Sequence, residues 1–565
     1  MGEKMAIQKT ASFLQNERDK LELRIQIDEC LFVDKRMRNK AFLFFLTRET
    51  EDLSSVGYEE RKDYADFLRE EKVFRKHREY MLAFDKIVIH HNCNKIIKSV
   101  TENGISYKNE IIYLPYEVKE KDTANLLTKT INKNELVWDF SIRCLASLKK
   151  QIVTMINSIL REYKVHHEQR IFLLALKRLY EYCFTNRIYN LMRMEKYEEN
   201  RFLLFLNKDS KLKKYAGKII SYCRKNLFLQ SKKIDWEANV WYIDRFHLDE
   251  SRLNLSCPID ILSFLAIDNL KNKQLVQKYI KYMIGVTDFS VNTIRNKLGV
   301  LKEYIIGLSD KSILESDTYD FDSYFNKIQS KENNPITINR KIMTVTGLYQ
   351  YLVVHGLIQQ IPYNPSYYFL KCDYYTHNDR AINNEVIKLI VENLAQCRED
   401  LRLMFLLLIC TGRRKSEICQ IKKNDLYREK DVCWIKFYQP KMASDILVPI
   451  PERLYEILDV YKNGVDRSEY MFINSNGFPY NSLTFSVEMV RFCRSIGCED
   501  IGYSFKAHDF RHTIATYLYE TGASIQSIRE FLGHKSDEMT KKYIDYIPKQ
   551  IEVKSRELFQ RRKHK

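Results

Sequence analysis

The most informative stretch of this sequence reads His508-Asp509-Phe510-Arg511-His512-Thr513. It is followed by Leu532-Gly533-His534 and then by Tyr543, nine residues beyond His534. Earlier in the chain stands Thr411-Gly412-Arg413-Arg414-Lys415-Ser416-Glu417, and Lys441 lies between the two groups. Each fragment is common by itself, so it is their order and spacing in one segment that indicate a site.

These residue types suit the cleavage of a phosphodiester without a metal ion. The attacked phosphate carries two charged nonbridging oxygens, and the guanidinium forks of Arg414 and Arg511 can bind them in bidentate fashion. A phenol with a pKa of about 10 is a weak nucleophile, so Tyr543 needs such activation before it attacks. Lys441 can protonate the departing 5′ oxygen once neighbouring cations lower its pKa.

Three further residues fit around this centre. His508 stands three residues before Arg511, so both side chains face one side of a helix and His508 can exchange a proton with the tyrosine. His534 can hydrogen-bond a nonbridging oxygen of the phosphate. Glu417 follows Arg414 by three residues and is expected to hold that guanidinium in place.

The pattern T-G-x-R-x-S-E, then H-x-x-R-H-T, then L-G-H with a tyrosine nine residues on, resembles the tyrosine recombinase/integrase family over about residues 380–550. The preceding region, with Thr337–Arg340 and Tyr351–Ile358, is similar to the helical core-binding domain of that family. The stretch from Ile234 to Tyr242, with the long region before it, further resembles the long tyrosine transposases of site-specific bacterial transposons.

The resemblance implies cleavage of double-stranded DNA through a covalent 3′-phosphotyrosine, with strand exchange through a four-way junction in a homotetrameric synapse. It implies no nucleotide, metal or other cofactor, and it leaves room for other recombinase subunits of the same element as partners. Carried over residue by residue, it assigns catalysis to the same six positions, with Glu417 in support: Arg414, Lys441, His508, Arg511, His534 and Tyr543.

One residue departs from the family pattern, and one pair of histidines allows a competing interpretation as a metal site. The residue before the catalytic arginine is usually apolar in the family, yet here it is Arg413, and Arg414 is preferred because it keeps the three-residue step to Glu417. His508 and His512 stand four residues apart, as two zinc ligands on a helix can. A cation, Arg511, lies between them instead of an acidic residue, so no metal site is expected.

The active lysine and the nucleophile each have a rival. Lys436, in the first of two expected strands, competes with Lys441. Tyr546 competes with Tyr543 but lies twelve residues from His534 instead of nine.

We expect a mainly α protein with helical N-terminal and core-binding domains, followed by an α+β catalytic domain with a small antiparallel sheet. With 16 Gly and 10 Pro in 565 residues, helix is the default interpretation. The expected domains are 1–235, of unknown role, 258–370, the core-binding domain, and 380–565, the catalytic domain. In the last, helices are expected at 401–410, 482–496, 508–520 and 524–532, and strands at 432–438 and 446–450.

One helix of the core-binding domain is especially clear. Apolar residues recur at steps of three and four along one face: Ile338, Ile342, Val345, Tyr349 and Leu352. Thr337 is the predicted N-cap and Gly356 the predicted stop.

The chain carries 92 Lys and Arg against 74 Asp and Glu, a formal net charge of +18, which favours a polyanionic partner such as DNA. Arg295, Lys297, Arg340 and Lys341 are candidates for contacts to DNA outside the active site. The absence of a long apolar run and of an apolar leader predicts a cytoplasmic protein with no membrane partner.

The leading interpretation is a site-specific recombinase that acts in transposition or integration of a mobile element; the sequence leaves integrase, transposase and resolvase roles open. An alternative with the same chemistry is a type IB topoisomerase-like enzyme that relaxes DNA. An alternative of another class is a catalytically silent DNA-binding regulatory subunit, which would not need the complete set of catalytic residues.

Overall fold

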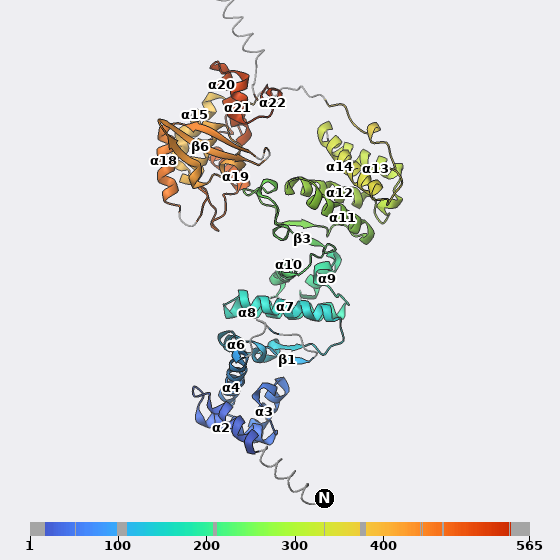
Figure 1. Cartoon of the computed structure of the whole chain (residues 1–565), viewed down its shortest axis with the longest axis vertical. Coiled ribbons are helices and arrows are strands. Elements are labelled where there is room, and N and C mark those ends of the chain that lie inside the picture. Colours follow the sequence, from blue (N-terminus) through green and yellow to red (C-terminus); the bar gives the residue numbers. More distant parts are fainter. Residues whose placement is uncertain are drawn as a thin grey trace, which may run out of the picture. The chain divides into compact units, whose positions relative to one another are not determined.

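The computed structural model describes residues 17–50, 52–98, 105, 110–206, 212–332, 334–372, 380–440, 442, 444–465, 468–541 and 543. Two compact units are distinguished, and each is described by itself (Figure 1). Unit 1 comprises the residues up to Arg245 together with Ser263–Asp268. Unit 2 comprises Phe246–Leu262 and the residues from Asn269 onward.

Unit 1 is built mainly from helices whose apolar faces pack together. Its described helices are α2 (Lys35–Thr47), α3 (Tyr58–Glu70), α4 (His77–Lys98), α5 (Leu114–Glu117), α6 (Lys121–Leu127), α7 (Ala146–Glu162), α8 (His166–Thr185), α9 (Lys196–Leu206) and α10 (Lys213–Gln230). In α7, for example, Leu148, Ile152, Ile156 and Ile159 follow the helical repeat and are completely buried. This face packs against α8 and α10.

Short strands and 3-10 helices join these helices. Strands β1 (Ile111–Tyr113) and β2 (Val137–Asp139) pair antiparallel, with Ile112 opposite Trp138. Strand β3 covers Val240–Tyr242, and β4 covers Ile261–Ser263. Within the described residues of both units, 3-10 helices cover Leu53–Ser55, Lys133–Leu136, Leu191–Arg193, Ile243–Phe246, Glu250–Arg252, Ile313–Glu315, Pro365–Tyr367, Leu394–Gln396 and Lys423–Asp425.

The first part of unit 2 contains helices α11 (Leu270–Val286), α12 (Val291–Gly307), α13 (Thr318–Lys331) and α14 (Pro335–Val354). The apolar face predicted for α14 is buried throughout. Gly356 lies just past its end with a φ of 66°, as expected of a helix stop. The predicted N-cap was wrong: the helix begins at Pro335, and the side chain of Asn334 accepts from the backbone N–H of Ile336.

The second part of unit 2 combines helices with a three-stranded antiparallel sheet. Its helices are α15 (Asn384–Asn393), α16 (Glu399–Thr411), α17 (Lys415–Ile418), α18 (Glu452–Asn463), α19 (Ser482–Ser495), α20 (Ala507–Glu520), α21 (Ile525–Leu532) and α22 (Asp537–Lys541). The strands, in the order β5-β6-β7, are Leu426–Glu429, Val432–Gln439 and Ser444–Ile450. The four predicted helices and the predicted hairpin are present.

The core of this domain lies between the sheet and α16. Ile435 and Val448, opposite each other in β6 and β7, are completely buried, as are Leu403, Leu407 and their neighbours in α16. Helix α18 lies alongside β6 (Figure 1), and α16 contacts α17, α19 and α20. The apolar run of α16 therefore fixes the elements that carry the sequence motifs.

The fold is thus mainly helical with small antiparallel sheets, as the sequence predicted. Within the described residues, no helix is both long enough and apolar enough to cross a lipid bilayer.

Candidate active site

The site begins where α16 ends. Gly412 terminates this helix with a φ of 59°, and a Cβ at this position would lie 3.3 Å from Cγ2 of Ile514. Glycine is therefore favoured both by the left-handed backbone and by the close approach of α20. The Gly412 carbonyl accepts a hydrogen bond of 3.0 Å from Nη1 of Arg511.

Arg414 follows the turn and caps the short helix α17. Its Nη1 donates to Oε1 of Glu417 at 2.6 Å, and its backbone N–H donates to the other carboxylate oxygen at 3.2 Å. Glu417 is buried, whereas part of the Arg414 side chain is exposed. The expected contact is therefore present, and it leaves other N–H groups of the guanidinium available to a ligand.

Arg511 on α20 is completely buried and joins two distant turns. Its Nη2 donates to the carbonyl of Leu532 at 2.6 Å and to Nε2 of His534 at 2.8 Å. The turn after α21 depends on Gly533, which has a φ of 66° and whose Cβ would lie 2.5 Å from Oε1 of Gln439. The L-G-H motif thus presents a carbonyl and an imidazole to the same guanidinium.

The contacts of His534 define its tautomer. An arginine can only donate, so Nε2 accepts from Arg511, and Nδ1 carries the proton toward Oγ1 of Thr540, 3.1 Å away. Thr540 on α22 is completely buried. No motif in the sequence pointed to this threonine, because hydroxyl partners of this kind have no fixed spacing.

Tyr543 lies directly after α22, in the midst of these groups. Its hydroxyl is 3.0 Å from Nε2 of His508. Its ring centroid is 4.7 Å from that of His534 and 4.5 Å from that of His512, and the Cζ atom of Arg511 lies 5.4 Å from it. The structure therefore brings together the phenol, the imidazoles and a guanidinium from helix α20 and from the segments that follow α21 and α22.

Burial and positive charge keep the imidazoles neutral near pH 7. Burial, assisted by Arg511 and Arg414, lowers the pKa of His534 to about 3. Burial, assisted by His512 and Arg511, also lowers the pKa of His508, although solvent at its exposed edge screens part of this effect. In the neutral tautomer that carries its proton on Nδ1, Nε2 of His508 accepts the hydrogen bond of the phenol and can take its proton.

Two family models match separate segments of unit 2. Residues 380–549 match the phage integrase family, and residues 276–356 match the N-terminal SAM-like domain of phage integrases. These two segments are thus the catalytic and SAM-like domains of the phage integrase type.

The chain is also similar to transposases and recombinases. It is 27% identical over 329 residues to transposase B from transposon Tn554 of Staphylococcus aureus, which covers 55% of this chain and 51% of that protein. It is 31% identical over 174 residues to tyrosine recombinase XerA of Pyrococcus furiosus, which covers 30% of this chain and 59% of that protein. The chain therefore spans about half the length of the transposase that it matches.

Among solved structures, the chain is similar to a lambda integrase fragment crystallised as a dimer bound to a COC′ core site. The TM-score is 0.40 and the sequence identity 20%, and the match covers 48% of this chain and 95% of that chain.

The two rival lysines differ in their surroundings. Lys441 lies outside the described residues, but Gln439 and Met442 of the same hairpin line a pocket of about 280 Å³ that reaches His534. Lys436 lies on β6, where its Nζ is 3.3 Å from a carboxylate oxygen of Asp425 and 3.7 Å from one of Asp445. These carboxylates raise the pKa of Lys436, which makes it a poorer acid.

The candidate DNA contacts on helices α12 and α14 divide into two groups. Arg295 and Lys297 on α12 and Arg340 on α14 line one pocket of about 640 Å³. Lys341 instead forms a half-buried ion pair of 2.9 Å with Glu303. Glu303 also lines this pocket, so Lys341 is neutralised beside it, whereas the other three cations form no ion pair among the described residues.

Arg413 occupies the position that is usually apolar and is completely buried. Its guanidinium lies between the rings of Phe437 and Phe531, with its Cζ atom 5.7 and 5.8 Å from the two centroids. Among the described residues, none of its three nitrogens has a hydrogen-bond partner, and burial lowers its pKa to about 9. The family pattern showed that an arginine is unusual at this position. Its burial could not be predicted, because arginine side chains are mostly exposed.

We predict that the buried His534 makes the protein less stable as the pH falls from 7 to 5. The unfolded state takes up a proton below the ordinary pKa of about 6.5, whereas the folded state, with a pKa of about 3, does not. The free energy of unfolding should therefore fall by about 2 kcal/mol from this residue alone.

Urea denaturation at pH 7 and pH 5 measures this difference. His534→Gln should weaken the pH dependence by that amount, while the control His167→Gln, at an exposed position on α8, should leave it unchanged. An unaltered pH dependence in His534→Gln would contradict the environment assigned to His534.

Proposed function

We propose that this chain is a site-specific DNA recombinase that cuts and rejoins duplex DNA through a covalent 3′-phosphotyrosine at Tyr543. It would act in the transposition or integration of a mobile element. One observation carries the proposal: the Tyr543 hydroxyl lies 3.0 Å from the neutral Nε2 of His508, beside the guanidinium of Arg511.

In the proposed cleavage step, the Tyr543 oxygen attacks phosphorus while its proton passes to Nε2 of His508. The bond between phosphorus and the 5′ oxygen breaks, and a 3′-phosphotyrosine remains. Arg414 and Arg511 would hold the nonbridging oxygens, where negative charge accumulates. A phosphate that draws Nη2 of Arg511 away would leave Nε2 of His534 without its donor. The ring can then change tautomer, with its proton lost from Nδ1 and gained at Nε2, so that Nε2 donates to a nonbridging oxygen and Nδ1 accepts from the Thr540 hydroxyl.

The departing 5′ oxygen needs a proton, and we assign its delivery to Lys441. The carboxylate neighbours of Lys436 argue against that lysine, while the pocket beside His534 is lined by hairpin residues on either side of position 441. Rejoining reverses the step: a 5′ hydroxyl attacks the phosphotyrosine, loses its proton to the lysine, and Tyr543 regains its own.

The organisation of the chain on DNA is also proposed. Residues 258–370 would form the core-binding domain, and residues 380–565 would form the catalytic domain. In the core-binding domain, the phosphates of DNA would be contacted by Arg295, Lys297 and Arg340. One tyrosine cuts one phosphodiester, so the exchange of two duplexes needs four cuts and a tetramer of this chain. The name of the Tn554 relative supports transposition, and other recombinases of the same element are further candidate partners.

We predict that Tyr543→Phe abolishes the covalent adduct on a nicked suicide duplex built on the junction mapped in cells that express the protein. The variant should bind this duplex as the parent does, because one hydroxyl contributes little to the interface. The adduct is measured by denaturing electrophoresis of labelled DNA, with Tyr546→Phe as the matched control that retains it.

The alternatives give different results in the same experiment. An undiminished adduct in Tyr543→Phe would remove the proposed nucleophile, and no adduct in the parent would favour a DNA-binding subunit. Relaxation of a supercoiled plasmid that lacks the junction would favour a topoisomerase-like enzyme. Chelator should leave the adduct unchanged.

A second prediction separates the two lysines. Lys441→Ala should reduce cleavage by about 10²- to 10⁴-fold, because the 5′ oxygen leaves without its proton. A duplex with sulfur in place of the bridging 5′ oxygen should restore the rate, since a thiolate is a good leaving group. Lys436→Ala should change cleavage of either substrate by less than about threefold; the reverse pattern would transfer the role to Lys436.

A further inference from the structure

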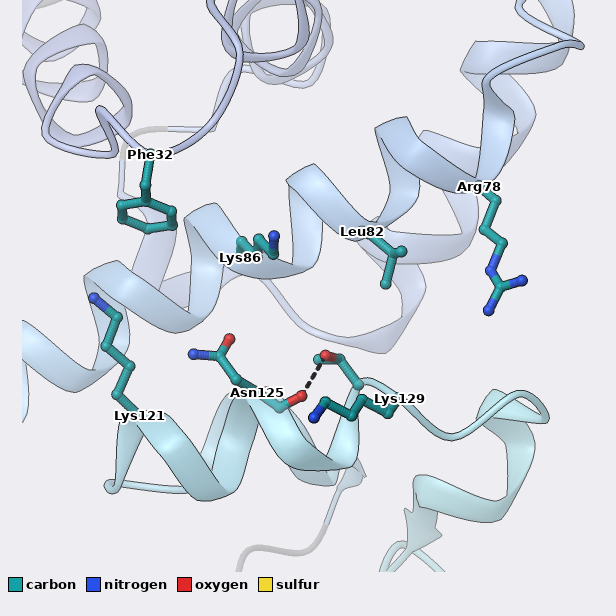
Figure 2. A pocket seen from close by; sticks show the side chains of 8 residues that line it. Phe32, Arg78, Leu82, Lys86, Lys121, Asn125 and Lys129 are labelled. Carbon is teal, nitrogen blue, oxygen red and sulfur yellow. Dashed lines mark hydrogen bonds between the residues drawn. The ribbon is translucent and has the colours of Figure 1, made fainter. Parts of the chain in front are cut away.

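Unit 1 contains a basic pocket that the proposed cleavage chemistry does not use. It has a volume of about 550 Å³ and lies between helices α4 and α6 (Figure 2). Its lining residues are Phe32, Arg78, Leu82, Lys86, Lys121, Asn125, Thr128 and Lys129. Four of the eight are cations, and none is a carboxylate.

The cations stand in two matching rows. Arg78, Leu82 and Lys86 are spaced four residues apart on α4, so they lie along one helix face. Lys121, Asn125 and Lys129 repeat the same spacing on α6 and the turn after it. Figure 2 shows the α4 side chains on one side of the pocket and those of α6 on the other. Each row thus places one positive charge at each end of the pocket.

The positions of the cations are set by buried neighbours. Asp85, next to Lys86, is completely buried and accepts hydrogen bonds from Arg61 at 2.7 Å and from the Tyr116 hydroxyl at 2.7 Å. These contacts fix the rotation of α4, and Lys86, about 100° further around the helix, is consequently exposed. At the pocket mouth, the Lys121 ammonium lies 2.9 Å from Nδ1 of His90 and 4.8 Å from the centroid of the Phe32 ring.

The remaining charges are available to a ligand. Arg78, Lys86 and Lys129 are exposed and form no ion pair within the described part of the chain. Some lysines elsewhere in unit 1 do have acidic partners, as Lys40 has Glu71 and Lys62 has Glu59. Four like charges around one pocket repel one another, so an anion that bridges them would relieve this repulsion.

We propose that this pocket binds the phosphodiester backbone of a DNA strand and gives the protein a DNA contact separate from the active site. The two rows can hold consecutive phosphates from both sides, and the side-chain amide of Asn125 supplies a polar group between them. The exposed ring of Phe32 offers a surface for a sugar or an unstacked base. The inference rests on the proposed function only for the choice of DNA as the polyanion.

The test compares two double variants of the full chain in the Tyr543→Phe background, where no covalent adduct can form. Lys86→Gln with Lys129→Gln removes two charges from the pocket. Lys214→Gln with Lys218→Gln removes two exposed charges from another part of unit 1 and is the matched control. Fluorescence anisotropy measures the Kd for a duplex of arbitrary sequence and for a single strand of equal length across a salt series.

We predict that the pocket variant binds DNA at least about fivefold more weakly than the parent at low salt. The slope of log Kd against log salt should fall by about 1.8 if the pocket holds duplex DNA, or by about 1.4 if it holds a single strand. A larger loss on one of the two probes identifies the form that is bound. The control should keep its slope within about 0.5 of the parent.

Equal losses in both double variants, or no loss in either, would overturn the inference. Lys86→Arg with Lys129→Arg keeps the charges and should keep the slope, which separates loss of charge from a folding defect. Adduct formation by the pocket variant with Tyr543 restored reports on the cleavage chemistry independently, so failure of this inference and failure of the proposed function give different results.

Discussion

The guanidinium of Arg511 is the group on which the candidate site depends. It is completely buried, and its hydrogen bonds reach the turn after α16, the turn after α21 and the imidazole of His534. Both turns need a left-handed glycine to present their carbonyls. A buried arginine without such partners would be strongly destabilising, so the motifs around Gly412 and Gly533 are held together by one charge.

The charge around this group is only partly balanced in the free protein. Glu417 pairs with Arg414, whereas Arg413 is buried with no hydrogen-bond partner among the described residues. Burial, together with these positive charges, lowers the pKa of His534 to about 3. A bound phosphodiester would supply the missing negative charge, and the pentavalent species formed during cleavage would supply more. The cost of assembling these cations in the free protein is thus offset most fully in the transition state, as catalysis requires.

Much of this could be predicted because its signals are local. The steps from Arg414 to Glu417 and from His508 to Arg511 follow the helical repeat, and the apolar face of α14 does too. Strand β5 was missed because Leu426–Glu429 is short and mostly polar, and the cap of α14 was misplaced because Asn334 before Pro335 is a stronger start than Thr337. Thr540 and the basic pocket between α4 and α6 arise from tertiary packing, which has no fixed spacing in the sequence.

The central claim is that Tyr543 is the residue that becomes joined to DNA. It is tested most directly by trapping the adduct on a suicide duplex, digesting the DNA and the protein, and locating the nucleotide-bearing peptide by mass spectrometry. The account predicts that fragmentation places the phosphonucleotide on the phenolic oxygen of Tyr543. A nucleotide on Tyr546, or on any residue outside the pocket formed by Arg511, His508 and His534, would contradict it.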